Sequence, residues 1–330
     1  MHEEHAEARL IRTSGRVTRT TAKVDADAAC WYPVGVREAA PSPEHEEEPA
    51  PPTLSVPAAV GLTALAFVLT RALFYAAGAL YAWRAGEPLP RGMAAAHADA
   101  LVHGLALAFG LGTATLLATS RGSRREPLTA RVGLVAVPYA ALAWATLLGA
   151  SVHVAGAEVV NQLREAFPLS PELDVAQRRL LTPENWLEGV GAVLAFVALA
   201  PFAEEVFFRG LVFPGLTRHY GHAWFAIAIS ALLFGATHVE PVAILYATLV
   251  GAALALLTVR ARSILPAAVA HAAHNAVPLL VPERVLRVEG LNTLAEAGYH
   301  LHPLIVLTAI LSALLAARAL LHSLETPPDA

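Results

Sequence analysis

Cysteine is nearly absent from this 330-residue sequence, because Cys30 is the only one and lies in a polar N-terminal segment. This excludes a disulfide framework and a cysteine-ligated metal site. Charged residues are also scarce, at 15% of the chain compared with about 25% in a typical soluble domain. Hydrophobic residues make up 56% and the mean hydropathy is +0.52, so the sequence predicts an all-α, polytopic membrane helical bundle.

The sequence also lacks a large net charge and a signal peptide. The net charge is only −4, and Lys23 is the only lysine among 23 basic residues, so no nucleic-acid partner is predicted. The N-terminus also lacks the basic and then apolar pattern of a signal peptide. We therefore expect the lipid bilayer as a partner, with insertion beginning at the first internal span.

Residues 1–53 form a polar segment that precedes the apolar spans. Weak alternation over Arg9–Val24 is consistent with a short hairpin, and Ala39–Pro52 is a linker rich in proline and glutamate. We expect 1–53 to be a disordered cytoplasmic tail and 54–322 to be the transmembrane bundle.

A membrane-crossing helix needs about 20 apolar residues to cover about 30 Å of hydrocarbon. Arginines in the connecting loops are slightly more numerous on the side of the N-terminus. The sequence thus predicts an integral protein of a bacterial inner membrane, with both termini in the cytoplasm. The length of the apolar stretches predicts about eight spans, at 54–83, 93–119, 132–153, 184–208, 222–238, 241–259, 264–281 and 301–320.

The fourth span carries three charged residues within the stretch A-P-F-A-E-E-V-F-F-R-G-L. A charge in the hydrocarbon core costs at least about 2.5–3.5 kcal/mol, so each one needs a partner or a function. Glu205 and Arg209 are four residues apart and can pair on one helix face. Glu204 lies about 100° around the helix and is left without a partner in this stretch.

Later spans carry the polar residues that Glu204 can meet. Phe234 and His238 share one helix face, and His271 and Asn275 share another. A lone histidine in an apolar helix is usually satisfied by a nearby carbonyl, but here polar residues lie on three different spans. If they meet in one pocket, a glutamate and a histidine can activate a water there. A histidine and an asparagine can then stabilise an oxyanion.

These residues form three motifs: E-E-V-F-F-R, F-G-A-T-H and H-A-A-H-N. They resemble E-E-x-x-x-R, F-x-x-x-H and H-x-x-x-N of the CAAX prenyl endopeptidase and bacteriocin-processing family of intramembrane proteases, also called CPBP or Abi. The resemblance covers residues 184–281. It implies an eight-span bundle with a site open toward the cytoplasm.

The resemblance also implies a role for each motif residue. It makes Glu204 and His238 the groups that activate water. It makes His271 and Asn275 the groups that stabilise the oxyanion. The supporting residues are Glu205, Arg209 and Phe234. The substrate implied is a membrane-anchored peptide or protein.

Two other functions and one cofactor question stay open at this point. The chain can be a non-catalytic protein that binds membrane peptides or confers bacteriocin immunity, or a proton-coupled transporter. No cofactor is expected, because asparagine beside the second histidine suits hydrogen-bond donation better than metal ligation. The alternative, a metalloprotease, would hold zinc with Glu204, His238 and His271.

Overall fold

The computed structural model describes residues 52–120, 127–238, 240–283, 285–292 and 300–325. The predicted hairpin at 9–24 and almost all of the predicted tail lie outside the described residues. Within these ranges the secondary structure is helical and contains no strand, which confirms the all-α prediction.

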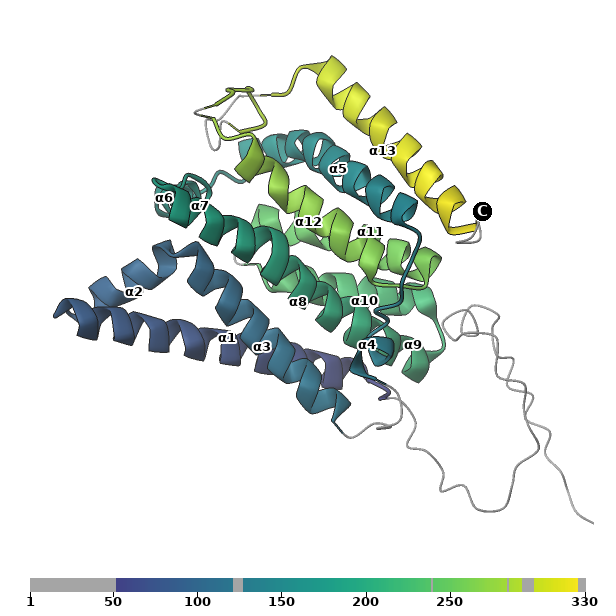
Figure 1. The fold of residues 1–330 in the computed structure, drawn as a ribbon, viewed down its shortest axis with the longest axis horizontal. Helices are drawn as coiled ribbons and strands as arrows, with labels where there is room; N and C mark the ends of the chain where they lie inside the picture. Colours follow the sequence, from purple (N-terminus) through teal and green to yellow (C-terminus); the bar gives the residue numbers. More distant parts are fainter. Residues whose placement is uncertain (1–51, 121–126, 239, 284, 293–299, 326–330) are drawn as a thin grey trace, which may run out of the picture.

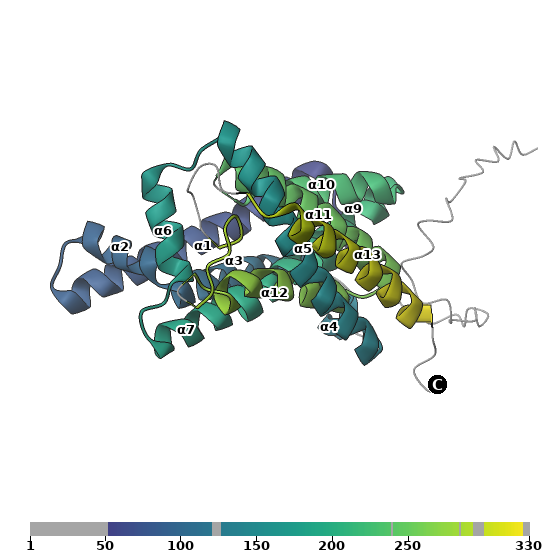
Figure 2. The ribbon, with the colours of Figure 1, turned by 90° about the horizontal axis from the view of Figure 1, so that it is seen from above.

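The helices pack side by side as one bundle, with α1 to α3 at one edge and α13 at the other (Figure 1). Figure 2 shows α6 crossing the bundle between the end of α5 and the start of α7. In chain order the elements are α1 (Val56–Ala85), α2 (Leu89–Ala98), α3 (Ala100–Thr119), α4 (Leu128–Arg131), α5 (Tyr139–Ala166), α6 (Pro171–Leu181), α7 (Trp186–Val193), η2 (Leu194–Leu199), α8 (Ala200–Phe207), η3 (Phe208–Val212), α9 (Phe213–Tyr220), α10 (Ala223–Ala236), α11 (Pro241–Ala261), α12 (Leu265–Leu280) and α13 (Pro303–Glu325).

The prediction of eight membrane spans is only partly supported. Among the described residues, six helical segments are long and apolar enough to cross a membrane: α1, α3, α5, the continuous run from α7 to α9, α11 and α13. The other two predicted spans correspond to α10, with 14 residues, and α12, with 16. At about 1.5 Å per residue these helices are about 21 and 24 Å long, which is less than the thickness of the hydrocarbon layer.

The predicted span 93–119 is broken into α2 and α3 at Asp99. The Asp99 carboxylate accepts hydrogen bonds from the backbone N–H groups of Leu101 and Val102, which caps the start of α3. Its second oxygen accepts a hydrogen bond of 2.7 Å from the hydroxyl of Tyr81 on α1. This half-buried carboxylate, which lies near the start of a predicted span, is therefore a helix cap.

The run from α7 to α9 is one helix interrupted by two π-helical segments, η2 and η3. A proline follows each segment, Pro201 after η2 and Pro214 after η3. Proline has no N–H, so it cannot complete the hydrogen-bond ladder of the preceding turn. A widened turn before each proline accommodates this loss, and such turns occur frequently at functional sites.

The interior of the bundle is rich in small residues, while large apolar side chains face outward. Alanines such as Ala145, Ala195 and Ala267 are fully buried, whereas Leu245, Leu249 and many other leucines are exposed. This distribution is typical of helices in lipid, where small residues let the backbones approach each other. It supports the membrane assignment independently of the hydropathy.

We define two ends of the bundle by their contacts. At the near end, α1 begins beside α9, and the N–H of Leu54 donates to Gly215 O. The helix α13 also ends there. The far end contains α6, the end of α10 and residues 285–292. Asn161 of α5 donates a hydrogen bond of 2.7 Å to Gly290 O there.

The contact between α5 and α12 depends on Gly149. A Cβ atom at this position would overlap the carbonyl oxygen of Ala270. We expect Gly149→Ala to reduce the free energy of unfolding by about 1–3 kcal/mol, the usual cost of overpacking. The measurement is chemical unfolding in detergent micelles. Gly112→Ala is the matched control, because no neighbour lies within 4 Å of the added Cβ. Equal unfolding midpoints for the two variants would contradict the predicted close contact.

Candidate active site

A buried ion pair lies at the centre of the bundle. Arg209 Nη1 donates to Glu205 Oε1 at 2.9 Å, and both side chains are fully buried. Arg209 Nη2 donates to Gly251 O on α11, also at 2.9 Å, and the guanidinium carbon lies 4.6 Å from the centre of the Phe234 ring. The i, i+4 spacing of the sequence therefore forms the expected pair, and this pair joins η3 to α10 and α11.

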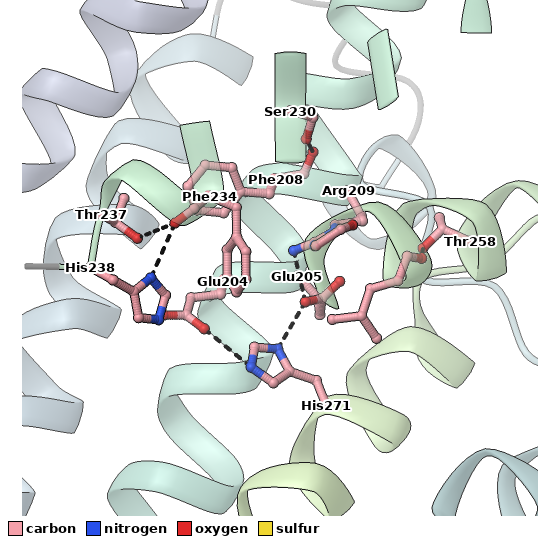
Figure 3. Close-up of polar contacts among 12 residues, drawn as sticks. Glu204, Glu205, Phe208, Arg209, Ser230, Phe234, Thr237, His238, Thr258 and His271 are labelled. Carbon is pink, nitrogen blue, oxygen red and sulfur yellow. Dashed lines mark hydrogen bonds and ion pairs between the residues drawn. The ribbon is translucent and has the colours of Figure 1, made fainter. Parts of the chain in front are cut away.

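His271 on α12 lies between the two glutamates of α8 (Figure 3). Its Nδ1 atom donates to Glu205 Oε1 at 2.9 Å, and its Nε2 atom lies 3.6 Å from Glu204 Oε2. Because Glu205 holds the Nδ1 side, the Nε2 side of the ring is presented to Glu204. Glu205 thus has two partners, Arg209 and His271, whereas the helix spacing alone predicted one.

His238 approaches Glu204 from the other side. Its Nδ1 atom donates to Phe234 O at 3.3 Å, which turns the second ring nitrogen toward the Glu204 carboxylate (Figure 3). The Phe234 ring packs against both imidazoles, with centroid distances of 5.4 Å to His238 and 5.7 Å to His271. The structure therefore brings Glu204, His238 and His271 together, and Phe234 fixes the two rings.

Asn275 lies one turn after His271 and makes a contact that the sequence did not suggest. Its side-chain amide donates to Phe196 O in η2 at 3.1 Å. In this π-helical turn the N–H of Ala200 bonds to Ala195 O, and the next residue, Pro201, has no N–H to offer Phe196. Asn275 satisfies the carbonyl that the proline leaves unpaired. One N–H of the amide is used in this way.

Sequence reasoning missed two parts of this site: the bond from His271 to Glu205 and the Phe196 carbonyl. The first is a tertiary contact between helices 66 residues apart in the chain. The second had a signal, since Pro201 stands inside a predicted span and removes one backbone donor there.

The charges of the site are nearly enclosed. The Glu204 side chain is 12% exposed and that of His271 is 6% exposed. Arg209 neutralises Glu205, so Glu204 is the remaining carboxylate and has two imidazoles for partners. Among the described residues, no group of three histidine, cysteine, aspartate or glutamate side chains is arranged to hold a metal ion.

Glu204 and His271 lie near the middle of their helical runs, whereas His238 lies just after the end of α10. The described chain begins and ends at the near end (Figure 1). Cytoplasmic termini and a site open toward the cytoplasm were both expected, and the two expectations require the same end. Both expectations stay predictions.

Residues 186–277 match the family model of the type II CAAX prenyl endopeptidases, Rce1-like. This segment runs from α7 into α12 and contains all three motifs. No curated protein and no solved structure matches the chain. The family prediction from the motifs is confirmed for this segment, and the apolar helices around it make the chain an integral membrane protein.

Proposed function

We propose that this chain is an intramembrane endopeptidase that hydrolyses peptide bonds in membrane-anchored peptides or proteins. The observation that carries the proposal is the enclosed Glu204 carboxylate, which lies 3.6 Å from His271 within the segment that matches a protease family. The location is the inner membrane of a bacterium, with both termini in the cytoplasm, as the arginine distribution favours.

In the proposed mechanism, the attacking water binds between Glu204 and His238. Glu204 takes one proton from this water as its oxygen attacks the scissile carbonyl carbon. The carbonyl oxygen becomes an oxyanion, which accepts hydrogen bonds from the second N–H of Asn275 and from Nε2 of His271. Because Nδ1 of His271 already donates to Glu205, the ring acts here as an imidazolium, which carries a hydrogen on both nitrogens. When the carbon–nitrogen bond breaks, Glu204 returns the proton to the leaving amine.

Three residues support this chemistry without touching the substrate. Glu205 holds the Nδ1–H of His271, so it sets the direction in which Nε2 points. Arg209 compensates the charge of Glu205 inside the bundle. Phe234 packs between the two imidazoles and its carbonyl orients His238.

The mechanism we propose is of the glutamate type and uses no metal. A zinc-dependent reaction would need three protein ligands on one ion. Asn275, one turn after His271, suits hydrogen-bond donation better than metal ligation, which favours the metal-free mechanism. In this proposal, o-phenanthroline and EDTA leave the cleavage rate within twofold of the untreated protein. Rate loss on chelation that added zinc restores would establish the metalloprotease alternative.

The experiment that tests the function uses purified protein in proteoliposomes. The probe is a library of palmitoylated twelve-residue peptides, and mass spectrometry identifies the products. Hydrolysis at internal peptide bonds is the expected result. Binding without cleavage would favour the non-catalytic, immunity-type alternative, and proton flux without cleavage would favour the transporter.

A further inference from the structure

A charged side chain, Arg71, faces outward in the middle of a membrane span. It lies on α1 near the midpoint between Val56 and Ala85, so it is about 21 Å or more from either end of the helix. Its side chain is exposed, and no other described charged side chain is exposed in the central third of a candidate span. Ionisable side chains in spans usually face the bundle interior or pair with one another, so this position indicates a function.

The charge of Arg71 is not neutralised within the described part of the chain. No described carboxylate forms an ion pair with its guanidinium. Asp99, at the start of α3, uses its two oxygens for the cap of that helix and for the hydroxyl of Tyr81. The guanidinium carbon of Arg71 lies 5.5 Å from the centre of the Phe74 ring, and a contact of this kind leaves the positive charge in place.

Lipid phosphates lie too far away to serve as the partner. The guanidinium lies over Phe74, which is seven residues or about 10 Å before Tyr81 on α1. Tyr81 bonds to Asp99 at the level where α3 begins, and α3 is about 30 Å long, the thickness of the hydrocarbon layer. The charge of Arg71 is thus inside the hydrocarbon layer, whereas the phosphates lie outside it.

Two exposed aromatic side chains flank Arg71 on the same face of α1. Phe67 lies one turn before it and Tyr75 one turn after it, and they are 50% and 57% exposed. Arginine and aromatic side chains are typical of the residues that dominate protein interfaces. The hydroxyl of Tyr75 can also donate to a carboxylate that pairs with Arg71. We call Phe67, Arg71 and Tyr75 the α1 ridge.

A second copy of this chain does not supply the missing negative charge. The described carboxylates in the middle of the spans, Glu204 and Glu205, are buried inside the bundle. A twofold-symmetric contact through the α1 ridge would instead place Arg71 of one copy against Arg71 of the other. Like charges repel strongly in a medium of low dielectric constant. The charge therefore selects a different protein, with an acidic residue at the same depth in the membrane.

We propose that the α1 ridge docks a membrane-spanning helix of a partner protein, and that an acidic residue in the middle of that helix pairs with Arg71. Tyr75 donates to the same carboxylate, and Phe67 packs against apolar side chains one turn away. The ridge is separate from the site around Glu204, because α1 lies at the edge of the bundle and α3 packs between α1 and α8 (Figure 1). Docking needs no cleavage, so the proposal goes beyond the peptidase function and does not depend on it.

The test measures cross-linking of the full chain to a synthetic helix in phosphatidylcholine proteoliposomes at pH 8. The chain carries Cys30→Ser and Val68→Cys, the latter an exposed position one turn before Arg71. The probe is a lysine-flanked helix of about 24 leucines and alanines, with a central glutamate and a cysteine one turn from it. We expect disulfides to form under copper–phenanthroline at least about fivefold faster than with a glutamine probe, which corresponds to about 1 kcal/mol.

Variants of Arg71 show whether its charge is responsible. Arg71→Leu should remove the preference for the glutamate probe, whereas Arg71→Lys, which keeps a positive charge, should retain a preference of at least about twofold. Leu311→Cys, 50% exposed near the middle of α13, is the matched control and should show no preference. Equal rates for the two probes with Arg71 in place overturn the proposal, and this comparison needs no variant of Arg71.

The other two occupants have outcomes of their own. Cross-linking between two Val68→Cys chains that is faster than cross-linking to the glutamate probe would assign the α1 ridge to a second copy. A glutamate preference that disappears when phosphatidylglycerol replaces half of the phosphatidylcholine would assign Arg71 to a lipid phosphate. Either outcome overturns the partner helix.

Discussion

Replacing Glu204 with glutamine should abolish peptide hydrolysis while leaving the bundle folded. Glutamine keeps the size of the side chain and can still accept a hydrogen bond near His271, but it cannot take a proton from water. The loss should appear in kcat rather than KM, and by at least the factor of about 10²–10⁴ that general acid–base catalysis contributes. Single-turnover cleavage of a library peptide measures it.

Glu188→Gln is the matched control for this experiment. Glu188 lies in α7 of the same long helix and pairs with Arg179 at 2.9 Å, but its side chain is 37% exposed and outside the site. An exposed pair contributes at most about 1 kcal/mol, so this variant should keep both its activity and its melting temperature. Activity of Glu204→Gln within about tenfold of the parent would remove Glu204 as the general base.

The positions of the helices could be predicted from the sequence, because the length of an apolar stretch depends only on neighbouring residues in the chain. Each predicted span overlaps a helix, and α11 begins at Pro241, one residue past the Glu240 cap whose carboxylate accepts from Val242 and Ala243. The count of membrane-crossing helices did not follow, because α10 and α12 are shorter than their apolar stretches. Where a helix ends depends on caps and neighbours as well as on hydropathy.

The site was predictable to the extent that it depends on helix periodicity. The spacing of Glu205 and Arg209 predicted their pairing directly. The place of His271 between two glutamates did not follow, because it depends on how α12 crosses α8. The contact of Asn275 with Phe196 requires a π-helical turn, which hydrophobic periodicity does not predict.

Arg209→Ala should destabilise the bundle more than Gly149→Ala or Glu204→Gln does. It removes the partner of Glu205, the hydrogen bond to Gly251 O and the contact with the Phe234 ring, all of them buried. Leaving one charge of a buried pair uncompensated costs about 3–5 kcal/mol. Chemical unfolding in micelles, followed by tryptophan fluorescence, measures the free energy of unfolding.

A double variant separates the charge from the volume of this pair. Glu205→Gln with Arg209→Met removes both charges, retains an oxygen that can accept from His271, and nearly preserves the side-chain volumes. Replacing a whole buried pair with neutral side chains is often tolerated, so much of the stability lost in Arg209→Ala should return. If Arg209→Ala instead melts like the parent but has no activity, the pair acts in catalysis and not in folding. Activity that returns with stability in the double variant would show that Glu205 serves the site by holding His271, a task for which a neutral acceptor is sufficient.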